Sequence, residues 1–178
     1  MAPFSIHGIG VSNGIAIGRA HLISNALLEV VQYDIEIKNI PLEVKRFEDA
    51  IAAVRVELNK IKSQLPSDSP KELSAFIDTH LMILNDKSLS SLPKSIIENE
   101  KCNAEWAIKK QMDSVVNQFD QIEDQYLRER KQDVIQVVER VIKILLGHSN
   151  QAAVKNKEKL TILVAHDISP ADALHFKN

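Results

Sequence analysis

The sequence predicts a mainly α protein with a partial α/β part, in which about four helices form a bundle. Three observations predict this class. Apolar residues recur at helical spacing from Pro41 to Gly147. A glycine-rich stretch with β-type runs precedes this region. A short, continuously apolar run follows it at residues 160–165. We therefore expect strands on either side of a helical bundle.

Composition limits the possible functions. The 178 residues carry a net charge of −2 and are 44% hydrophobic, which is enough to build a core. Because there is no basic excess to neutralise phosphates, we expect no nucleic-acid binding. Cys102 is the single cysteine, so no internal disulfide is expected and a cytoplasmic location fits. No apolar run reaches the ~18 residues of a membrane span, so no membrane insertion is expected.

Residues 8–23 contain four of the five glycines. We predict a turn at residues 12–14 and a strand from Ile15 to Ile23. The glycines do not follow a nucleotide-binding pattern, because neither a helix signal nor a Gly-Lys-Ser/Thr sequence follows them. Residues 27–40 alternate weakly between apolar and polar side chains, which fits either a second strand or an extended arm.

The first helix is predicted from Pro41 to Leu65. Its apolar residues are spaced alternately three and four apart, which is a two-position heptad seam. The seam residues are Val44, Phe47, Ile51, Val54, Leu58, Ile61 and Leu65. Such a seam can pair two chains in a coiled coil, but further amphipathic helices follow, and they favour packing within one bundle.

The sequence Ser69-Pro70-Lys71-Glu72 predicts the start of a second helix through a capping box with proline at the first helical position. Asn85-Asp86 ends it. This helix is apolar on more than one side, because Met82 and Ile83 fall outside its core-facing stripe. Either two faces are buried or an apolar patch faces a partner. His80 is either a packed residue or part of that patch.

A short helix with Pro93 near its start comes next, and Asn103 is predicted to cap a long helix that leads on to Gly147. The apolar stripe of this last region is interrupted by Arg130 and Asp133. The interruption indicates either a join between two core helices, with the charges solvated, or a polar recognition patch.

The apolar run from Leu160 to Ala165 predicts a buried, parallel strand. Residues 169–172 form a second capping box, so strand, loop and helix begin a βαβ unit. Its return strand should follow after about ten or more residues. The sequence stops at Asn178, inside this helix, and we therefore expect it to be a piece of a longer protein.

The residues alone indicate a binding module with one edge of an enzyme domain attached. The six histidines show no metal-binding spacing. Cys102 shows no local sign of activation, and the aspartates are scattered and form no carboxylate pair. We therefore expect no catalytic, cofactor-binding or metal-binding residue in this chain.

Four blocks of sequence carry a family resemblance: Gly8–Gly18, His80–Asp86, Asp124–Asp133 and Ile162–Pro170. In this order they resemble the amino-terminal domain of the enzyme I family, the phosphoenolpyruvate–protein phosphotransferases of the bacterial sugar phosphotransferase system. The segment Tyr126-Leu-Arg-Glu-Arg130 is the most specific part, and the resemblance covers essentially the whole chain.

The resemblance implies a helical bundle inserted in a truncated phosphohistidine-type α/β domain. Residues 1–30 would hold its first strands, residues 31–147 the helical subdomain that docks the carrier protein HPr, and residues 148–178 the truncated continuation. Enzymes of this family transfer a phosphoryl group from phosphoenolpyruvate, with magnesium, to one of their own histidines and then to a histidine of HPr. That histidine lies in a Gly-Gly-x-Thr-Ser-His motif, expected beyond Asn178, so this chain is expected to be inactive alone.

The resemblance also implies partner-binding residues and an oligomeric state. The expected HPr-binding residues are Phe76, His80, Met82, Ile83, Asp86, Tyr126 and Arg130. Lys87 and Ser88 stand where the family usually has further acidic residues, which allows another carrier, such as the nitrogen-branch paralogue of HPr. Phosphoenolpyruvate and magnesium would bind only through the missing carboxy-terminal domain. The family's dimer contact lies there too, so we expect a monomer here and a homodimer at full length.

Two other interpretations stay open. The chain could be a helical adaptor, unrelated to phosphotransfer, that dimerises through the seam at residues 44–65. Alternatively, its α/β part could belong with the phosphohistidine domains of pyruvate phosphate dikinase and phosphoenolpyruvate synthase. This last possibility is the weakest, because those enzymes do not carry the helical insertion.

Overall fold

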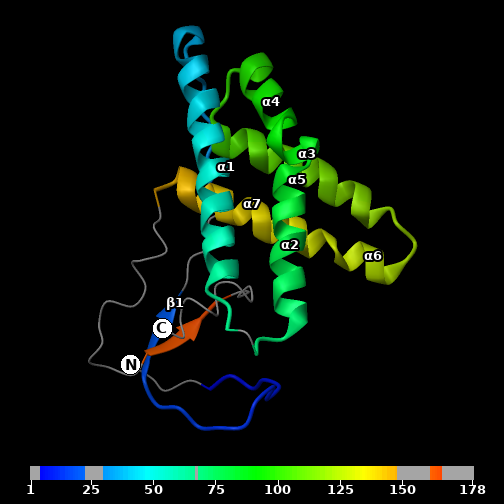
Figure 1. Ribbon diagram of the computed structural model, residues 1–178. Helices are drawn as coiled ribbons and strands as arrows, with labels where there is room; N and C mark the ends of the chain where they lie inside the picture. Colours follow the sequence, from blue (N-terminus) through cyan, green and yellow to red (C-terminus); the bar gives the residue numbers. More distant parts are fainter. Residues whose placement is uncertain (1–4, 23–29, 67, 148–160, 166–178) are drawn as a thin grey trace.

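Two short parallel strands lie on either side of the helices in the sequence and next to each other in space. The computed structural model describes residues 5–22, 30–66, 68–147 and 161–165. β1 (Arg19–Leu22) pairs with β2 (Thr161–Val164) in parallel register, with Arg19 opposite Thr161. Parallel strands need a crossover connection, and here the helical bundle forms part of that connection (Figure 1).

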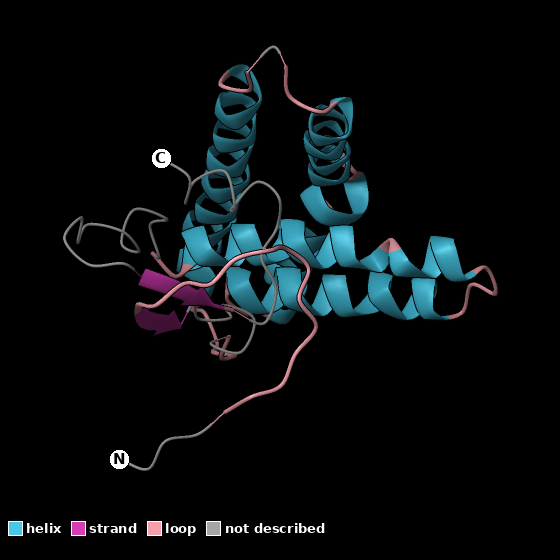
Figure 2. Ribbon diagram, turned by 90° about the horizontal axis from the view of Figure 1, so that it is seen from below, coloured by secondary structure: helices cyan, strands magenta, loops and turns pink. Residues whose placement is uncertain are grey.

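Within the described residues, four long helices make up the bundle: α1 (Ile40–Ser63), α2 (Lys71–Asn85), α5 (Ala104–Asp120) and α7 (Lys131–Leu145). The short helix η2 (Ile37–Asn39) precedes α1. The shorter helices that join the long ones are α3 (Lys87–Ser90), α4 (Leu92–Glu100) and α6 (Gln125–Glu129). α1 and α2 run alongside each other and cross the pair formed by α5 and α7 (Figures 1 and 2). The predicted mainly α fold is confirmed.

The heptad seam of α1 is buried inside this bundle. Phe47, Val54 and Leu58 have no exposed surface, and they belong to one core cluster with Ile77 of α2 and Val138 of α7. Burying a side chain of this size contributes about 1.5–3 kcal/mol. Because the seam is used within the chain, it is not available in this structure for the coiled-coil dimer that the adaptor interpretation requires.

The strands differ from their predictions in length and burial. The predicted strand at residues 15–23 is reduced to β1, and residues 15–18 have no regular structure. Where a turn was predicted at residues 12–14, the chain bends at residues 11–12 and Gly14 has a φ of 148°, but residues 12–14 form no regular turn. β2 is parallel as predicted, but the prediction that it is buried is wrong. Among the described residues only β1 pairs with it, and the side chains of β2 are exposed except for the partly buried Leu163. The second capping box at residues 169–172 lies outside the described residues.

Of residues 27–40, predicted as a second strand or an extended arm, residues 30–36 form an arm and residues 37–40 are helical. Residues 30–36 run beside the start of α5 without entering the sheet. A bridge joins Asp34 to Cys102, and Ile35 N–H donates to the Lys101 carbonyl at 2.7 Å. The Cys102 thiol beneath the arm is buried, and this burial raises its pKa. The thiol is therefore less nucleophilic than an exposed one.

The capping box predicted at Ser69 is wrong. Pro70 occupies the N-cap position with a ψ of 135°, so α2 begins one residue later than predicted, at Lys71, and no side chain caps it. The Pro70 carbonyl accepts from Leu73 N–H at 3.1 Å and closes the first turn. Ser69 lies outside the helix, where its N–H donates to the Pro66 carbonyl at 3.0 Å. A proline can hold this extended backbone because only its φ is fixed.

The long helix predicted to lead on to Gly147 is interrupted by a reversal of the chain. α5 ends at Asp120, and the Asp124 side chain starts α6 by accepting from Leu127 N–H at 2.9 Å. α7 then returns beside α5 (Figure 2). The predicted join between two core helices is therefore confirmed. Gly147, with a φ of 75°, follows the end of α7 as predicted.

Candidate docking surface on the helical bundle

α2 carries an exposed apolar side chain opposite its core face. The core face consists of Ile77, His80 and Leu84, which are all buried. Met82 lies between the last two in sequence and therefore points to the other side of the helix, where 68% of its surface is exposed. Ile83 is partly buried against the core. Of the two apolar residues outside the predicted stripe, Met82 is thus the one open to solvent.

His80 is a packed residue in this structure. Its surface is only 1% exposed, and its ring lies 4.0 Å from the ring of Phe76, centroid to centroid, at 46°. Phe76 is itself partly buried against the core. Since the His80 side chain is not accessible here, it supports the surface from beneath and does not form part of it.

Asp86 forms the junction between α2 and α3. Its carboxylate accepts from Ser88 N–H at 2.8 Å and from the Ser88 hydroxyl at 2.5 Å, and so caps α3. These two bonds lower the pKa of Asp86. The side chain is exposed and stays ionised near neutral pH, with exposed Lys87 beside it. This corner of the surface therefore presents one negative and one positive charge.

At the other end of the bundle, α6 presents an aromatic ring with a fixed guanidinium. Tyr126 is 63% exposed and Leu127 next to it is 49% exposed. The Arg130 guanidinium lies over the Tyr126 ring, 4.6 Å from its centroid, and donates to the Tyr126 hydroxyl. It also bonds Asp133 at 3.3 Å. Arg130 thus stays on the surface, and Tyr126 and Asp133 set its position. The join between α6 and α7 therefore also forms a polar patch.

Arg128 holds the turn that carries this patch. Its Nε donates to the Ile122 carbonyl at 3.0 Å, and its Nη2 donates to the Glu123 carbonyl at 2.9 Å. These carbonyls lie just beyond the end of α5, where helical partners are missing. Lys131 forms an ion pair with Asp120 across the same turn. The position of α6 is therefore fixed by bonds on both of its sides.

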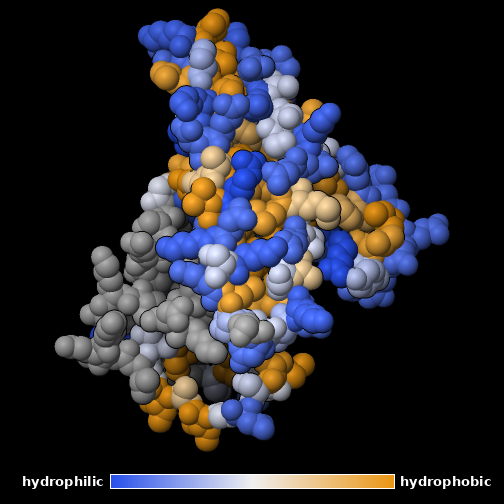
Figure 3. All heavy atoms as spheres, viewed as in Figure 1, coloured by the Kyte–Doolittle hydropathy of each residue, from blue (hydrophilic) through white to orange (hydrophobic). Residues whose placement is uncertain are grey.

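The two groups of residues flank the same pair of helices. α2 packs on α7, α3 packs on α5, and α6 packs on both. The face shown in Figure 3 has hydrophobic surface over α2 and again towards α6, with strongly hydrophilic groups between them. The structure brings Tyr126 together with Arg130, and Phe76 together with His80. Exposed apolar groups beside oriented charges are suited to protein binding.

Other kinds of site are not supported within the described part of the chain. No group of three or more histidine, cysteine, aspartate or glutamate side chains there could hold a metal ion. Among the same residues, no helix is both long and apolar enough to cross a membrane.

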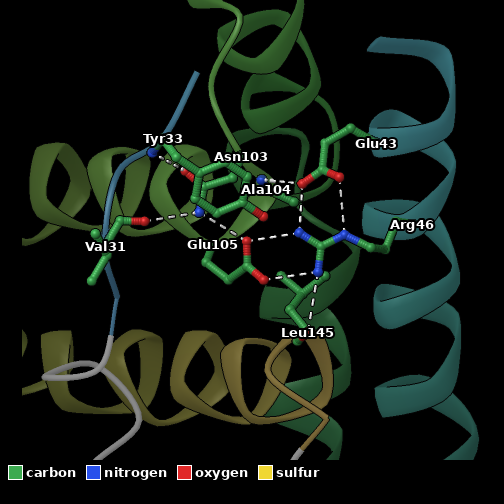
Figure 4. A network of polar contacts seen from close by, with 8 residues as sticks. All are labelled: Val31, Tyr33, Glu43, Arg46, Asn103, Ala104, Glu105 and Leu145. Atoms are coloured by element: carbon green, nitrogen blue, oxygen red, sulfur yellow. Dashed lines mark hydrogen bonds and ion pairs between the residues drawn. The ribbon is translucent and has the colours of Figure 1, made fainter. Parts of the chain in front are cut away.

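The sequence interpretation missed three features of this surface and its support. Leu127 was not expected to be exposed, and Arg128 was not expected to hold a turn, because the reversal at residues 121–124 was not foreseen. An ion-pair network around Arg46 and Glu105 was also missed (Figure 4). The spacing of Glu43 and Arg46 on one helix could have indicated a local ion pair, but nothing in the sequence links them to Glu105.

The fold and the surface together define a class: a helical module set between two strands of one parallel sheet, with exposed apolar groups beside oriented charges on one face. Comparison with known proteins gives the family. The chain belongs to the family described as PEP-utilising enzyme, N-terminal, whose model matches residues 7–130.

Individual relatives agree with this assignment. The chain is 47% identical over 99% of its length to a phosphoenolpyruvate-protein phosphotransferase of Cupriavidus necator, and 34% identical over 94% to one of Listeria monocytogenes. It spans 31% and 29% of the length of these two relatives.

Solved structures are similar in fold. An NMR solution structure of Enzyme I matches 91% of this chain with a TM-score of 0.70 at 27% identity, and the match covers 65% of that chain. A structure titled N-terminal domain of Enzyme 1 - Nitrogen matches 90% of this chain and 64% of its own, with a TM-score of 0.69. At 24% identity, this second match shows the fold alone.

Proposed function

We propose that this chain is the carrier-docking, amino-terminal part of a phosphoenolpyruvate–protein phosphotransferase. The whole enzyme would pass a phosphoryl group from phosphoenolpyruvate to a histidine of its own, and from there to a histidine of HPr. The observation that carries the proposal is the 47% identity, along 99% of the chain, to a relative of that name. Phosphoenolpyruvate, magnesium and the homodimer contact are assigned to parts of the longer protein outside this chain, which would itself be monomeric.

The division into parts belongs to the same proposal. Residues 31–147 would form the docking subdomain, and residues 1–30 and 148–178 would contribute to a discontinuous α/β subdomain. The parallel pairing of β1 with β2 supports this division, because it unites segments that are separated by all the described helices. The catalytic histidine would lie outside this chain.

The docking surface would consist of two parts with different roles. Met82, together with Leu127 and the Tyr126 ring, offers exposed apolar area that a partner can bury. Arg130 and Asp86 would orient the partner and raise the association rate. Arg130 needs little reorganisation for this role, because Tyr126 and Asp133 already hold it. Phe76 and Ile83 would support this area from the partly buried side of α2, and buried His80 would support it from beneath.

The test is a chemical-shift titration of the isotope-labelled chain with unphosphorylated HPr from the same organism. We expect shifts confined to residues 72–90 and 122–134, which weaken as salt is added. Arg130→Gln should lower the affinity, whereas the control Lys45→Gln, on exposed α1 surface, should not.

A parallel titration with the nitrogen-branch paralogue of HPr tests carrier choice. Tighter binding of that paralogue would assign the chain to the nitrogen branch, in agreement with Lys87 and Ser88 standing where further acidic residues were expected. Absence of shifts with both carriers would contradict the docking proposal.

A further inference from the structure

An open hollow lies between the arm and the start of α1. Its volume is about 440 Å³, which falls within the ~300–1,000 Å³ range of ligand sites. Tyr33 and Leu42 line it with exposed side chains, and Ile35 lines it with a partly buried one. The hollow therefore offers an aromatic and an aliphatic surface that a long side chain can contact.

The arm that forms one wall of the hollow is fixed in place. Tyr33 N–H donates to the Asn103 carboxamide, and the carboxamide donates to the Val31 carbonyl, both at 3.1 Å (Figure 4). Ile35 N–H donates to the Lys101 carbonyl. Asn103 was predicted to cap α5 with its side chain, but no such bond forms, and the carboxamide binds the arm instead. Because this wall is already ordered, a guest loses little free energy in shaping it.

Arg46, the basic residue in the lining, is already saturated with partners. Its guanidinium donates to both carboxylate oxygens of Glu43, with a 3.0 Å bond from Nε, and to both of Glu105, at 2.8 and 2.7 Å (Figure 4). Its Nη1 also donates to the Leu145 carbonyl at 3.1 Å. All five N–H donors are thus engaged. An anionic guest would therefore find no free donor on Arg46.

The ion pairs of Arg46 leave negative charge beside the hollow. One guanidinium and two carboxylates, from Arg46, Glu43 and Glu105, give a net charge of −1 at neutral pH. Burial and the charge of Glu105 raise the pKa of the Tyr33 hydroxyl, Arg46 lowers it, and Glu43 raises it again. At Tyr33 the two carboxylates therefore outweigh the guanidinium.

The arm adds two more carboxylates to the lining of the hollow. Asp34 is exposed and forms no ion pair within the described residues. Glu36 is neutralised by Lys38, whose Nζ lies 2.6 Å from its carboxylate. A guest that carries a positive charge on an apolar stem fits this lining, and the side chains of lysine and arginine have that form. Such a cation can also lie over the exposed Tyr33 ring.

The hollow lies at the other end of the α5–α7 pair from α6. Arg46 reaches the start of α5 through Glu105 and the end of α7 through Leu145, whereas α6 lies between the end of α5 and the start of α7. The 17 residues of α5 span about 25 Å. The hollow is therefore separate from Tyr126, and the polypeptide that follows Gly147 sets out from the end of the bundle that carries the hollow.

The source of the guest follows from the strength of the contact. One side chain is too weak an anchor to hold two separate proteins together, because association costs translational and rotational freedom. Within one polypeptide the guest is tethered at an effective concentration on the order of millimolar, so the same contact can stay formed. The chain spans 31% and 29% of the length of the two phosphotransferase relatives, so the proposed function leaves a long polypeptide outside these residues.

We propose that the hollow binds the side chain of a lysine or arginine from a segment of the longer polypeptide that lies beyond these 178 residues. The contact holds that segment against the helical bundle at the end opposite α6. The inference rests on the proposed function in one respect only, namely that this chain is part of a longer polypeptide.

The first test probes the hollow in the isolated chain. The isotope-labelled chain is titrated with Nα-acetyl-lysine methylamide and, separately, with Nα-acetyl-norleucine methylamide, which has the apolar stem without the charge. The lysine probe should shift the amide signals of residues 33–46, and the norleucine probe should not. Absence of shifts with the lysine probe, or equal shifts with both probes, would overturn the proposal.

A charge variant checks the role of the arm. Asp34→Asn should raise the Kd of the lysine probe about two- to fivefold, because it removes one exposed carboxylate from the lining. The matched control Asp49→Asn, whose carboxylate pairs with Lys45 outside the hollow, should leave this Kd unchanged. An unchanged Kd in Asp34→Asn would also overturn the proposal.

The second test compares the chain with the longer protein by hydroxyl-radical footprinting. The chain has two tyrosines, and both Tyr33 in the hollow and Tyr126 on α6 are exposed. In the longer protein Tyr33 should be oxidised several times more slowly than in the chain, whereas Tyr126 should react at the same rate in both. Equal rates at Tyr33 would refute the proposal.

Two further outcomes identify what covers Tyr33. Asp34→Lys in the longer protein should repel the guest and restore the rate seen in the isolated chain. Protection that persists in this variant would mean that the covering group is not a cation. Protection of Tyr33 in the isolated chain that grows with its concentration would assign the hollow to a second copy. Either result would overturn the proposal.

The carrier titration separates this inference from the proposed function. Carrier-induced shifts at residues 72–90 and 122–134, together with an unprotected Tyr33 in the longer protein, would refute this inference alone. Protection of Tyr33 without any carrier-induced shift would contradict the docking proposal alone.

Discussion

Replacement of Met82 by alanine should separate docking from stability. Met82 is 68% exposed, so truncation removes few internal contacts and should change the free energy of unfolding by no more than about 0.5 kcal/mol. A fully buried methionine is worth about 1.5–3 kcal/mol. If a carrier covers the exposed two thirds of the side chain, truncation of Met82 should weaken the binding free energy by about 1–2 kcal/mol. This corresponds to a roughly 5- to 30-fold rise in Kd.

Isothermal titration calorimetry with the carrier measures the binding change, and urea unfolding measures the stability change. Val56 of α1 provides a matched control, because it is also 68% exposed. Val56→Ala should leave both quantities unchanged. Ile77→Ala provides the opposite control, since Ile77 is fully buried on the same helix as Met82. It should cost about 2–5 kcal/mol of stability.

Two results would refute the reasoning. An unchanged Kd for Met82→Ala would place Met82 outside the contact surface, however exposed it is. A loss of stability similar to that of Ile77→Ala would mean that Met82 packs as a core residue.

Three further predictions follow from the same geometry. Glu105 has its pKa held below 4.5, so its stabilising contribution is present above about pH 4.5 and is lost as the pH falls through the lower folded value. Glu105→Gln should therefore be less stable than wild type at pH 7 but lose less stability on acidification. Unfolding curves measured from pH 7 to 3 would check this. If the free energies of unfolding of the two proteins fall in parallel with pH, the prediction is contradicted. Arg128→Ala should cost about 1 kcal/mol, since two carbonyl bonds are lost, and should shift NMR signals around residues 120–131 while Lys109→Ala does not. His80→Ala should lower stability by about 2 kcal/mol because the ring is buried against Phe76, and a variant that loses carrier binding without any loss of stability would show that the ring is a direct contact.

Much of the fold could be predicted from local patterns. The heptad spacing of residues 44–65 requires one continuous buried stripe, whatever packs against it, and α1 has that stripe. The β-branched run at residues 160–165 likewise requires an extended segment, and β2 lies there. These predictions succeeded because the period of apolar residues depends only on the backbone geometry of each element.

The candidate site was less predictable. Sequence spacing placed Met82 off the core stripe and Arg130 at a break in another stripe, and both side chains are exposed. It did not decide whether His80 is packed or accessible. Helical spacing shows which residues share a face, but the elements that pack on that face decide which of them are buried. Nor did it locate the reversal at residues 121–124. That turn depends on the Asp124 cap and on Arg128, which binds carbonyls five and six residues away.

The sequence by itself determined which segments are helical, which face of α1 is buried and which residues interrupt the apolar stripes, because these properties depend on near neighbours in the chain. Only the tertiary structure decided that α5 and α7 lie side by side, that β1 pairs with β2, and that Arg46 meets Glu105 and Leu145. These contacts join residues 59 and 99 positions from Arg46. No local pattern encodes them, since they arise only when separate elements pack together.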